Sequence, residues 1–232
     1  MSLRRPPGSD SVLIIVAKRP APGRTKTRLS PPLTPAQAAD LYECFLKDTV
    51  QLVRALADVQ PAIAYLPAGE ASYFTQLAPG FERLLQRGRN LGERLDHALS
   101  HFLERGYRRV AVMNSDSPTL PRRHLHACFE RLTGDTDVVI GPCVDGGYYL
   151  LGTRRPVPGL TRDVSMSTPR VTADTLALAA EQALSVQLLP PWYDVDDVQA
   201  LSRLAADLAN RPGVARHTRR FIEHHRRLLE SL

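Results

Sequence analysis

The sequence predicts an α/β fold: one domain built on a mostly parallel β-sheet with helices on both faces. Short apolar runs rich in β-branched residues, such as "SVLIIVA" at 11–17, alternate with longer helical segments over almost the whole chain. No internal repeat, low-complexity segment or obvious linker interrupts this alternation. A length of 232 residues also suits a single α/β domain.

Seven segments are predicted to be strands. The run at 11–17 is apolar at almost every position, which indicates a central strand buried on both faces. An Asp-Gly pair between two of the runs is a β-hairpin signal. In chain order, the predicted strands are 11–17, 61–67, 81–87, 108–114, 136–142, 148–153 and 185–191.

Capping residues mark where several helices begin. Thr34 followed by Pro35 is a typical helix start, because proline at the first helical position needs no N–H partner. Asn90 and Glu93 have the spacing of a capping box. The predicted helices are 35–58, 70–78, 90–105, 121–132, 168–184, 197–209 and 214–230.

Two further caps and the domain limits follow from the same signals. Thr119 is the best-placed N-cap for the helix at 121–132, and Asp196 for the helix at 197–209. We expect a flexible N-terminus at 1–10, the α/β domain at 11–209 and a C-terminal helix at 210–232.

The composition narrows the class of protein. A net charge of +6 and a pI of about 9.5 favour anionic partners such as nucleotides, nucleic acid or a membrane surface. No run is apolar enough for a transmembrane segment, and the polar N-terminus is a poor secretory signal. The sequence contains three widely spaced cysteines, Cys44, Cys128 and Cys143. Their odd number and wide spacing indicate reduced thiols, so we expect a cytoplasmic protein.

Three polar clusters fall at the ends of predicted strands. They are the loop at 18–28, the triplet Asn114-Ser115-Asp116, and the segment 143–147. In open parallel sheets, ligands bind in the crevice outside the carboxyl ends of the strands. The sequence therefore predicts that these three clusters converge on one site.

The first loop, "KRPAPGRTKTR", is suited to binding phosphate. Lys18, Arg24, Lys26 and Arg28 supply positive charge, and Gly23 gives the backbone the freedom to wrap an anion. The glycine–lysine–serine spacing of a P-loop is absent. The alternative is a basic loop that only contacts solvent.

Two other clusters supply carboxylates. Asp116 follows a strand and would suit Mg²⁺ or Mn²⁺ held jointly with a diphosphate, and Asp194 could complete that metal site. Each also has a simpler interpretation, since aspartates commonly begin helices. Asp145 precedes Gly146 and Gly147, so it either marks a hairpin or acts as a general base where ligand approaches the backbone.

These clusters together resemble a bacterial family of glycosyltransferase-like proteins. The resemblance covers roughly residues 11–205, and six motifs in order make it specific. They are "AKRPAPGRTKTRL", "NLGERL", "SDSPTL", "DGGYYLLG", "STPRVTADTL" and "YDVDD". Such proteins have the Rossmann-like, three-layer α/β/α fold of nucleotide-diphospho-sugar transferases (GT-A). The same fold carries nucleotidyltransferases that make molybdenum-cofactor dinucleotides and guanylylated phospholactate.

The resemblance implies roles for the loop at 17–28, for Asp116 and for residues 145–148, and the chemistry of the other residues extends this set. Asp145 would be catalytic, Asp116 and Asp194 would bind the metal, and the cofactor would be Mg²⁺ or Mn²⁺. The implied nucleotide-binding residues are Ala17, Lys18, Pro22, Gly23, Lys26, Thr27, Arg28, Arg94 and Ser115. The residues implied to face the sugar or the acceptor are Gly146, Gly147, Tyr148, Ser167 and Thr168.

The chain departs from the family pattern at three places. Met166 stands where the resemblance leads us to expect tryptophan, and Asp197 stands where it leads us to expect threonine. The Asp116 stretch contains one aspartate rather than a full D-x-D motif. Met166 in place of tryptophan affects a stacking contact expected at that position. The single aspartate at Asp116 affects how tightly a metal is held.

Three functions are compatible with the sequence. The first is glycosyl transfer from a nucleotide-diphospho-sugar to a small acceptor. The second is nucleotidyl transfer from GTP or CTP to a phosphate-bearing small molecule, with release of pyrophosphate. The third is a basic module that binds nucleic acid or a membrane surface. No nucleic-acid-binding motif is present and aromatic content is only 6%, so we expect a nucleotide donor and a small acceptor rather than nucleic acid.

Overall fold

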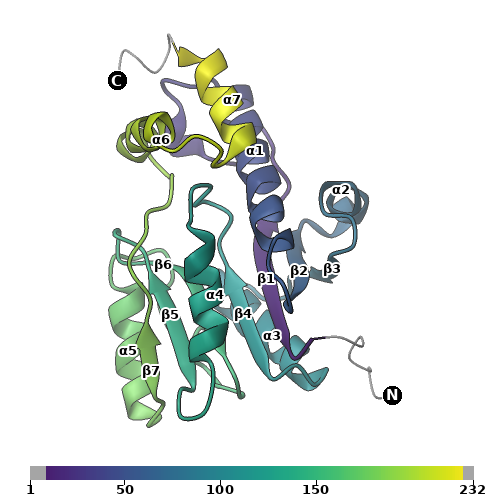
Figure 1. Cartoon of the computed structure of the whole chain (residues 1–232), viewed down its shortest axis with the longest axis vertical. Coiled ribbons are helices and arrows are strands. Elements are labelled where there is room, and N and C mark those ends of the chain that lie inside the picture. The colour runs from purple at the N-terminus through teal and green to yellow at the C-terminus, as the bar shows by residue number, and fades with distance from the viewer. Residues whose placement is uncertain (1–8, 227–232) are drawn as a thin grey trace.

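The computed structural model describes residues 9–226 and contains one seven-stranded sheet (Figure 1). The strand order is β3-β2-β1-β4-β6-β5-β7. All pairs are parallel except those of β6, which runs antiparallel to β4 and β5. The strands are β1 Ser11–Lys18, β2 Gln60–Leu66, β3 Glu82–Leu85, β4 Arg109–Met113, β5 Val138–Pro142, β6 Tyr148–Thr153 and β7 Val186–Leu188.

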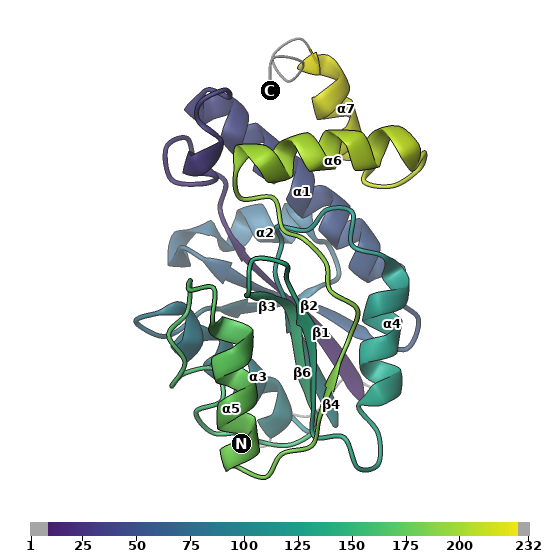
Figure 2. The same ribbon diagram turned by 90° about the vertical axis from the view of Figure 1, so that its left-hand side faces the viewer.

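Helices cover both faces of the sheet, as the sequence predicts. Figure 2 shows α3 and α5 on one side and α4 on the other. The α-helices are α1 Pro35–Arg54, α2 Ala71–Leu77, α3 Leu91–Glu104, α4 Arg122–Arg131, α5 Val171–Glu181, α6 Val198–Asn210 and α7 Arg216–His224. Short 3₁₀ turns are η1 Thr27–Leu29 and η2 Ala68–Glu70.

Two apolar cores lie on the two faces of the sheet. One contains Phe45 of α1 and Phe129 of α4; the other contains Leu99 and Phe102 of α3. Strand β1 contributes alternate residues to both cores and is almost wholly buried. This explains its continuous apolar sequence, because a strand covered on both faces has no position that must be polar.

The C-terminal helices lie against α1 at one end of the molecule (Figures 1 and 2). Asp48, buried in α1, accepts hydrogen bonds from the backbone N–H groups of His217 (3.0 Å) and Thr218 (2.8 Å) at the start of α7. Ala215 occupies the N-cap position of α7 and has no side chain that can cap it. Asp48 therefore supplies from another helix the cap that the local sequence lacks.

Most predicted elements are confirmed to within a few residues. The α1 capping box is present, with Thr34 accepting from the Gln37 N–H. Asn90 caps α3, but the Glu93 carboxylate accepts from the backbone of Arg89 rather than of Asn90. The hairpin signal is confirmed by the antiparallel pairing of β5 and β6. The predicted N-terminal segment at 1–8 and the end of the predicted last helix at 227–232 lie outside the described residues.

Two predicted helix caps are wrong. Helix α4 has Pro121 at its N-cap position and no side-chain cap, while the Thr119 hydroxyl is 3.0 Å from the Tyr193 hydroxyl. Helix α6 is capped by Asp197, which accepts from the Ala200 N–H at 2.8 Å. Asp196 is thereby free to make a tertiary contact. Within residues 9–226, no helix combines the length and apolarity that crossing a membrane requires.

Candidate active site

A crevice opens at the edge of the sheet where β1 and β4 end and β6 begins. It consists of two cavities of about 360 and 550 Å³ that share Asp116, Asp196 and Arg28 among their lining residues. We call the smaller cavity the basic half, because Lys18, Lys26, Arg28 and Arg94 line it. We call the larger cavity the acidic half, because it is lined by Asp116, Asp145, Asp194 and Asp196.

Most of the predicted site residues line this crevice. Pro22, Gly23 and Gly146 are not among the lining residues of either half in the described chain. The basic half includes Ala17, Lys18, Lys26, Thr27, Arg28, Arg94, Ser115 and Asp116. The acidic half includes Asp116, Asp145, Gly147, Tyr148, Ser167, Thr168 and Asp194.

Lys26 lies at the junction of the two halves. Its backbone is left-handed (φ 51°), and its side chain is only 5% exposed. The ammonium forms ion pairs with Asp116 and with Asp196, the latter at 2.7 Å. Arg28, which is largely exposed, also pairs with Asp196 at 3.2 Å. The first loop is thus closed onto two carboxylates from distant parts of the chain.

The charges at this junction stabilise one another. Burial alone would lower the pKa of Lys26, but Asp116 and Asp196 outweigh burial and raise it. Burial would likewise raise the pKa of Asp196, but Lys26 and Arg28 hold it below its ordinary value. Lys26 therefore carries its positive charge, and Asp196 its negative charge, across the physiological pH range.

Buried hydrogen bonds fix the strand end that carries Asp116. The Ser115 hydroxyl donates to the Val16 carbonyl at 3.0 Å and lies 2.9 Å from the Tyr42 hydroxyl on α1. The Asn114 side chain accepts from the Asp116 N–H at 3.3 Å. Asp116 is consequently held at the rim of the crevice by groups from β1 and α1, which gives this carboxylate a defined position without a capping role.

The segment after β7 brings two more carboxylates to Asp116. The Val195 N–H donates to the Asp116 carbonyl at 2.9 Å, and the Val195 side chain is fully buried. Alternation along this extended segment puts Asp194 and Asp196, on either side of Val195, toward the crevice. Asp196 is predicted from the sequence to be a helix cap; the alternation of aspartates about a buried valine is the signal that could have placed it in the site.

Asp194 lies among like charges. Burial, and then the neighbouring Asp196, Asp145 and Asp116, raise its pKa from 3.8 to about 7. The ligand atoms of Cys143, Asp145 and Asp194 all lie within 4.8 Å of one another. A divalent cation would relieve the repulsion between the two carboxylates, which are ligands for a hard metal ion, whereas burial raises the pKa of the Cys143 thiol and keeps it a neutral, soft ligand.

The β5–β6 turn shapes the acidic half. Asp145 accepts from the Gly147 N–H at 3.0 Å through one carboxylate oxygen. Gly146 has φ +94°, and a Cβ on it would lie 1.9 Å from the Pro169 carbonyl oxygen. Gly146 therefore allows the Pro169 backbone to approach closely. That packing holds the segment carrying Ser167 and Thr168 beside Asp145.

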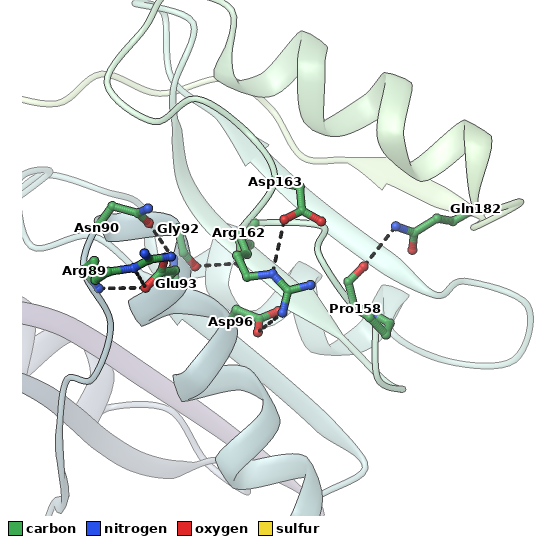
Figure 3. A network of polar contacts seen from close by, with 10 residues as sticks. Arg89, Asn90, Gly92, Glu93, Asp96, Pro158, Arg162, Asp163 and Gln182 are labelled. Carbon is green, nitrogen blue, oxygen red and sulfur yellow. Dashed lines mark hydrogen bonds and ion pairs between the residues drawn. The ribbon is translucent and has the colours of Figure 1, made fainter.

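A polar network joins α3 to the loop before α5 (Figure 3). The Thr161 hydroxyl donates to the Gly92 carbonyl at 3.1 Å, and Arg162 pairs with Asp96 (3.9 Å) and Asp163 (3.2 Å). A Cβ on Gly92 would lie 2.3 Å from the Thr161 carbonyl oxygen. The glycine of the "NLGERL" motif is thus required for α3 to meet the loop before α5, a role that sequence reasoning missed.

Similarity to known proteins agrees with this architecture. Residues 49–168 match the sequence profile of a family described as "Uncharacterized protein conserved in bacteria (DUF2064)". The chain belongs to this family. No curated protein matches its sequence.

Solved structures similar to this member of the family show the same fold. The "putative nucleotide-diphospho-sugar transferase" of Desulfovibrio desulfuricans G20 is 32% identical over 96% of this chain and 98% of that chain, with a TM-score of 0.88. The predicted resemblance and three-layer α/β fold are thereby confirmed.

More distant structures share the fold alone. CMP:2-keto-3-deoxy-manno-octonic acid synthetase in complex with CTP is 14% identical over 87% of this chain and 99% of that chain (TM-score 0.57). A Mycobacterium tuberculosis H37Rv protein in complex with manganese is 17% identical over 85% and 98% of the two chains (TM-score 0.55).

Proposed function

We propose that the protein transfers a glycosyl group from a nucleotide-diphospho-sugar to a hydroxyl group of a small acceptor. The similarity to the "putative nucleotide-diphospho-sugar transferase" of Desulfovibrio desulfuricans G20, at 32% identity over 96% of the chain, supports a nucleotide-activated donor. The division of the crevice into a basic and an acidic half supports the choice of glycosyl transfer. The basic half suits the donor's diphosphate, and the acidic half suits an acceptor that carries no negative charge.

The basic half is assigned to the donor's diphosphate. Lys18, Lys26, Arg28 and Arg94 line it, and together they would balance the charge of the nucleoside diphosphate that leaves. The Arg94 guanidinium donates to the Gly88 carbonyl at 3.1 Å, which orients it at the start of α3. Tyr42 and Gln86 also line this half and had no place in the sequence-based assignment.

Asp116 and Asp194 are assigned to a Mg²⁺ or Mn²⁺ ion. Both carboxylates line the acidic half, and Asp116 also borders the basic half, where the diphosphate is assigned. A divalent ion there would supply positive charge to the departing diphosphate oxygen. Burial and then the neighbouring carboxylates raise the pKa of Asp194, and a cation bound there would offset both effects, which supports this assignment.

Asp145 is assigned as the general base of an inverting transfer. One of its oxygens accepts from Gly147, while the side chain is exposed at the wall of the acidic half. As the acceptor oxygen forms its bond to the anomeric carbon, the bond from that carbon to the diphosphate oxygen breaks. The acceptor proton passes to the Asp145 carboxylate.

The charge of the acidic half is the observation that favours glycosyl over nucleotidyl transfer. Among the described residues that line it, Arg28 is the one lysine or arginine, and Arg28 is already paired with Asp196. Apart from the metal ion assigned to Asp116 and Asp194, a phosphate-bearing acceptor would meet four aspartates and, among the described lining residues, no unpaired cationic side chain. A neutral hydroxyl compound carries no such electrostatic cost, and residues such as Val112 and Met166 offer it apolar contact.

A thermal-shift panel tests the proposal. UDP, GDP, CDP and dTDP sugars, with GTP and CTP for comparison, are each added with and without Mn²⁺. A ligand present at one hundred times its Kd stabilises by about 2.7 kcal/mol, roughly 5–10 °C for a chain of this length. The expected result is a Mn²⁺-dependent shift with one sugar nucleotide, followed by its turnover when acceptors are supplied.

Matched variants give the panel its controls. Asp116→Asn should abolish the shift, whereas Asp174→Asn, which removes an equal charge from α5 at a position outside both halves of the crevice, should keep it. A shift confined to triphosphates would move the assignment to nucleotidyl transfer. No shift with any nucleotide would contradict both reactions.

A further inference from the structure

The Lys26 ammonium occupies the position between Asp116 and Asp196. Both ion pairs involve the same nitrogen, and the Lys26 side chain is far less exposed (5%) than those of Asp116 (31%) and Asp196 (37%). The ammonium lies 5.7 Å from the centroid of the Tyr42 ring and 5.5 Å from that of the Phe45 ring. The lysine therefore approaches the two carboxylates from the protein interior, while the carboxylates face the crevice.

A divalent cation at Asp116 competes with this ammonium. A carboxylate that already accepts a short, charge-assisted bond from lysine is a weaker ligand, since its charge is partly neutralised. Two positive groups within one small carboxylate cluster also repel each other. Metal binding to the ligand-free protein must therefore weaken or displace the contacts of Lys26.

The basic half of the crevice offers Lys26 an alternative partner, the assigned diphosphate. Lys26 lines the basic half, where we assign the diphosphate. Lysine has a flexible four-carbon stem and a compact charge, so its ammonium can exchange one anion for another within a few ångströms. A diphosphate would take over the lysine and leave Asp116 and Asp196 as ligands for the metal.

We propose that Lys26 couples the two ligands: it holds Asp116 and Asp196 in the free protein and releases them when a nucleoside diphosphate binds. This inference rests on the proposed function, because it takes the metal and the diphosphate to meet at Asp116. It adds Asp196 to the metal-binding residues. The consequence is an order of binding. The nucleotide binds first or binds together with the metal, and the metal does not bind first.

Direct Mn²⁺ binding, measured from the EPR signal of free Mn²⁺, tests the coupling. Lys26→Met should bind Mn²⁺ without nucleotide at least about tenfold more tightly than the wild type, a change of about 1.4 kcal/mol. Lys47→Met removes the same charge from the surface of α1, where Lys47 pairs with Glu43, and should change the Mn²⁺ affinity less than about twofold.

The wild type provides a second measurement. Adding UDP or GDP should raise its Mn²⁺ affinity, after correction for the Mn²⁺ that the free nucleotide chelates, and should raise that of Lys26→Met much less. Lys26→Gln keeps a polar side chain at this buried position, and it replaces Lys26→Met if circular dichroism shows that the methionine variant is unfolded. The effect of nucleotide on the Mn²⁺ affinity of the wild type is measured without either variant, so it tests the coupling even if both variants unfold.

The outcomes separate this inference from the proposed function. If the wild type and both Lys26 variants bind Mn²⁺ equally without nucleotide, while Asp116→Asn does not bind it, the metal site stands and the coupling is refuted. Lys26 is then a permanent structural ion pair. If no variant binds Mn²⁺ with or without nucleotide, the metal assignment fails and the coupling fails with it.

Discussion

Replacing Asp194 by asparagine should stabilise the metal-free protein increasingly as the pH rises from 4.5 to 8. Asp194 lies in the acidic half with Asp116, Asp145 and Asp196. Burial and these three carboxylates raise its pKa from 3.8 to about 7. An ionised Asp194 therefore costs free energy in the folded protein that asparagine, which never ionises, does not.

The sign follows from proton binding. Between about pH 4 and pH 7, the folded protein keeps the Asp194 proton while the unfolded chain has lost it. Unfolding then releases a proton, so raising the pH favours the unfolded state. Below pH 4 both states hold the proton and the effect vanishes; above pH 7 both have lost it and the cost is at its full value.

The magnitude follows from the same two pKa values. The difference between 3.8 and about 7 is roughly three powers of ten in the dissociation constant, which sets a ceiling of about 4 kcal/mol. Asp194 is only partly buried, so solvent screening reduces the expected gain to about 1–2 kcal/mol. For a chain of this length, that corresponds to roughly 2–8 °C in Tm.

The assay is differential scanning fluorimetry in EDTA at half-unit steps from pH 4.5 to 8.5. The quantity to follow is the Tm of Asp194→Asn minus that of the wild type, because this difference removes effects common to both proteins. Asp174 is a half-exposed carboxylate that pairs with Arg170 at the start of α5, outside the acidic half, and Asp174→Asn should show no such trend. A Tm difference that is flat with pH, or that falls as the pH rises, would refute the reasoning.

Two substitutions test the packing that builds the site. Gly92→Ala would place a Cβ 2.3 Å from the Thr161 carbonyl oxygen and should cost about 1–3 kcal/mol by denaturant titration, whereas Gly69→Ala, with no atom near its Cβ, should change stability little. Equal effects would contradict the close approach. Asp48→Ala should speed amide exchange in α7 by removing the acceptor for two N–H groups, and exposed Asp40→Ala on the same helix should not. Unchanged exchange in α7 would show that its start is held by other contacts.

Local signals were enough for most of the secondary structure. The β-branched run at 11–17 became the central strand, and Thr34 capped α1 at the predicted position. Periodicity and capping act over a few residues, so the sequence determines them almost independently of the rest of the fold. The two wrong caps, Thr119 and Asp196, are positions where a tertiary partner competed with the local role.

Asp196 shows why that competition could not be read from the sequence. Two neighbouring aspartates, Asp196 and Asp197, both precede α6, and either has the chemistry of an N-cap. Lys26, 170 residues earlier, pairs with Asp196 and leaves Asp197 to cap the helix. The choice depends on where β1 and β7 lie in the sheet, and no local pattern contains that information.

The sequence by itself determined the fold class, the strand ends at which polar clusters gather, and the basic character of the first loop. Those features follow from short-range periodicity and from the general rule that strand ends form a crevice. Tertiary structure decided that the crevice has a basic and an acidic half and that Lys26 joins them. Charge pairing is set by packing between distant segments, so it appears only when the sheet and its helices are assembled.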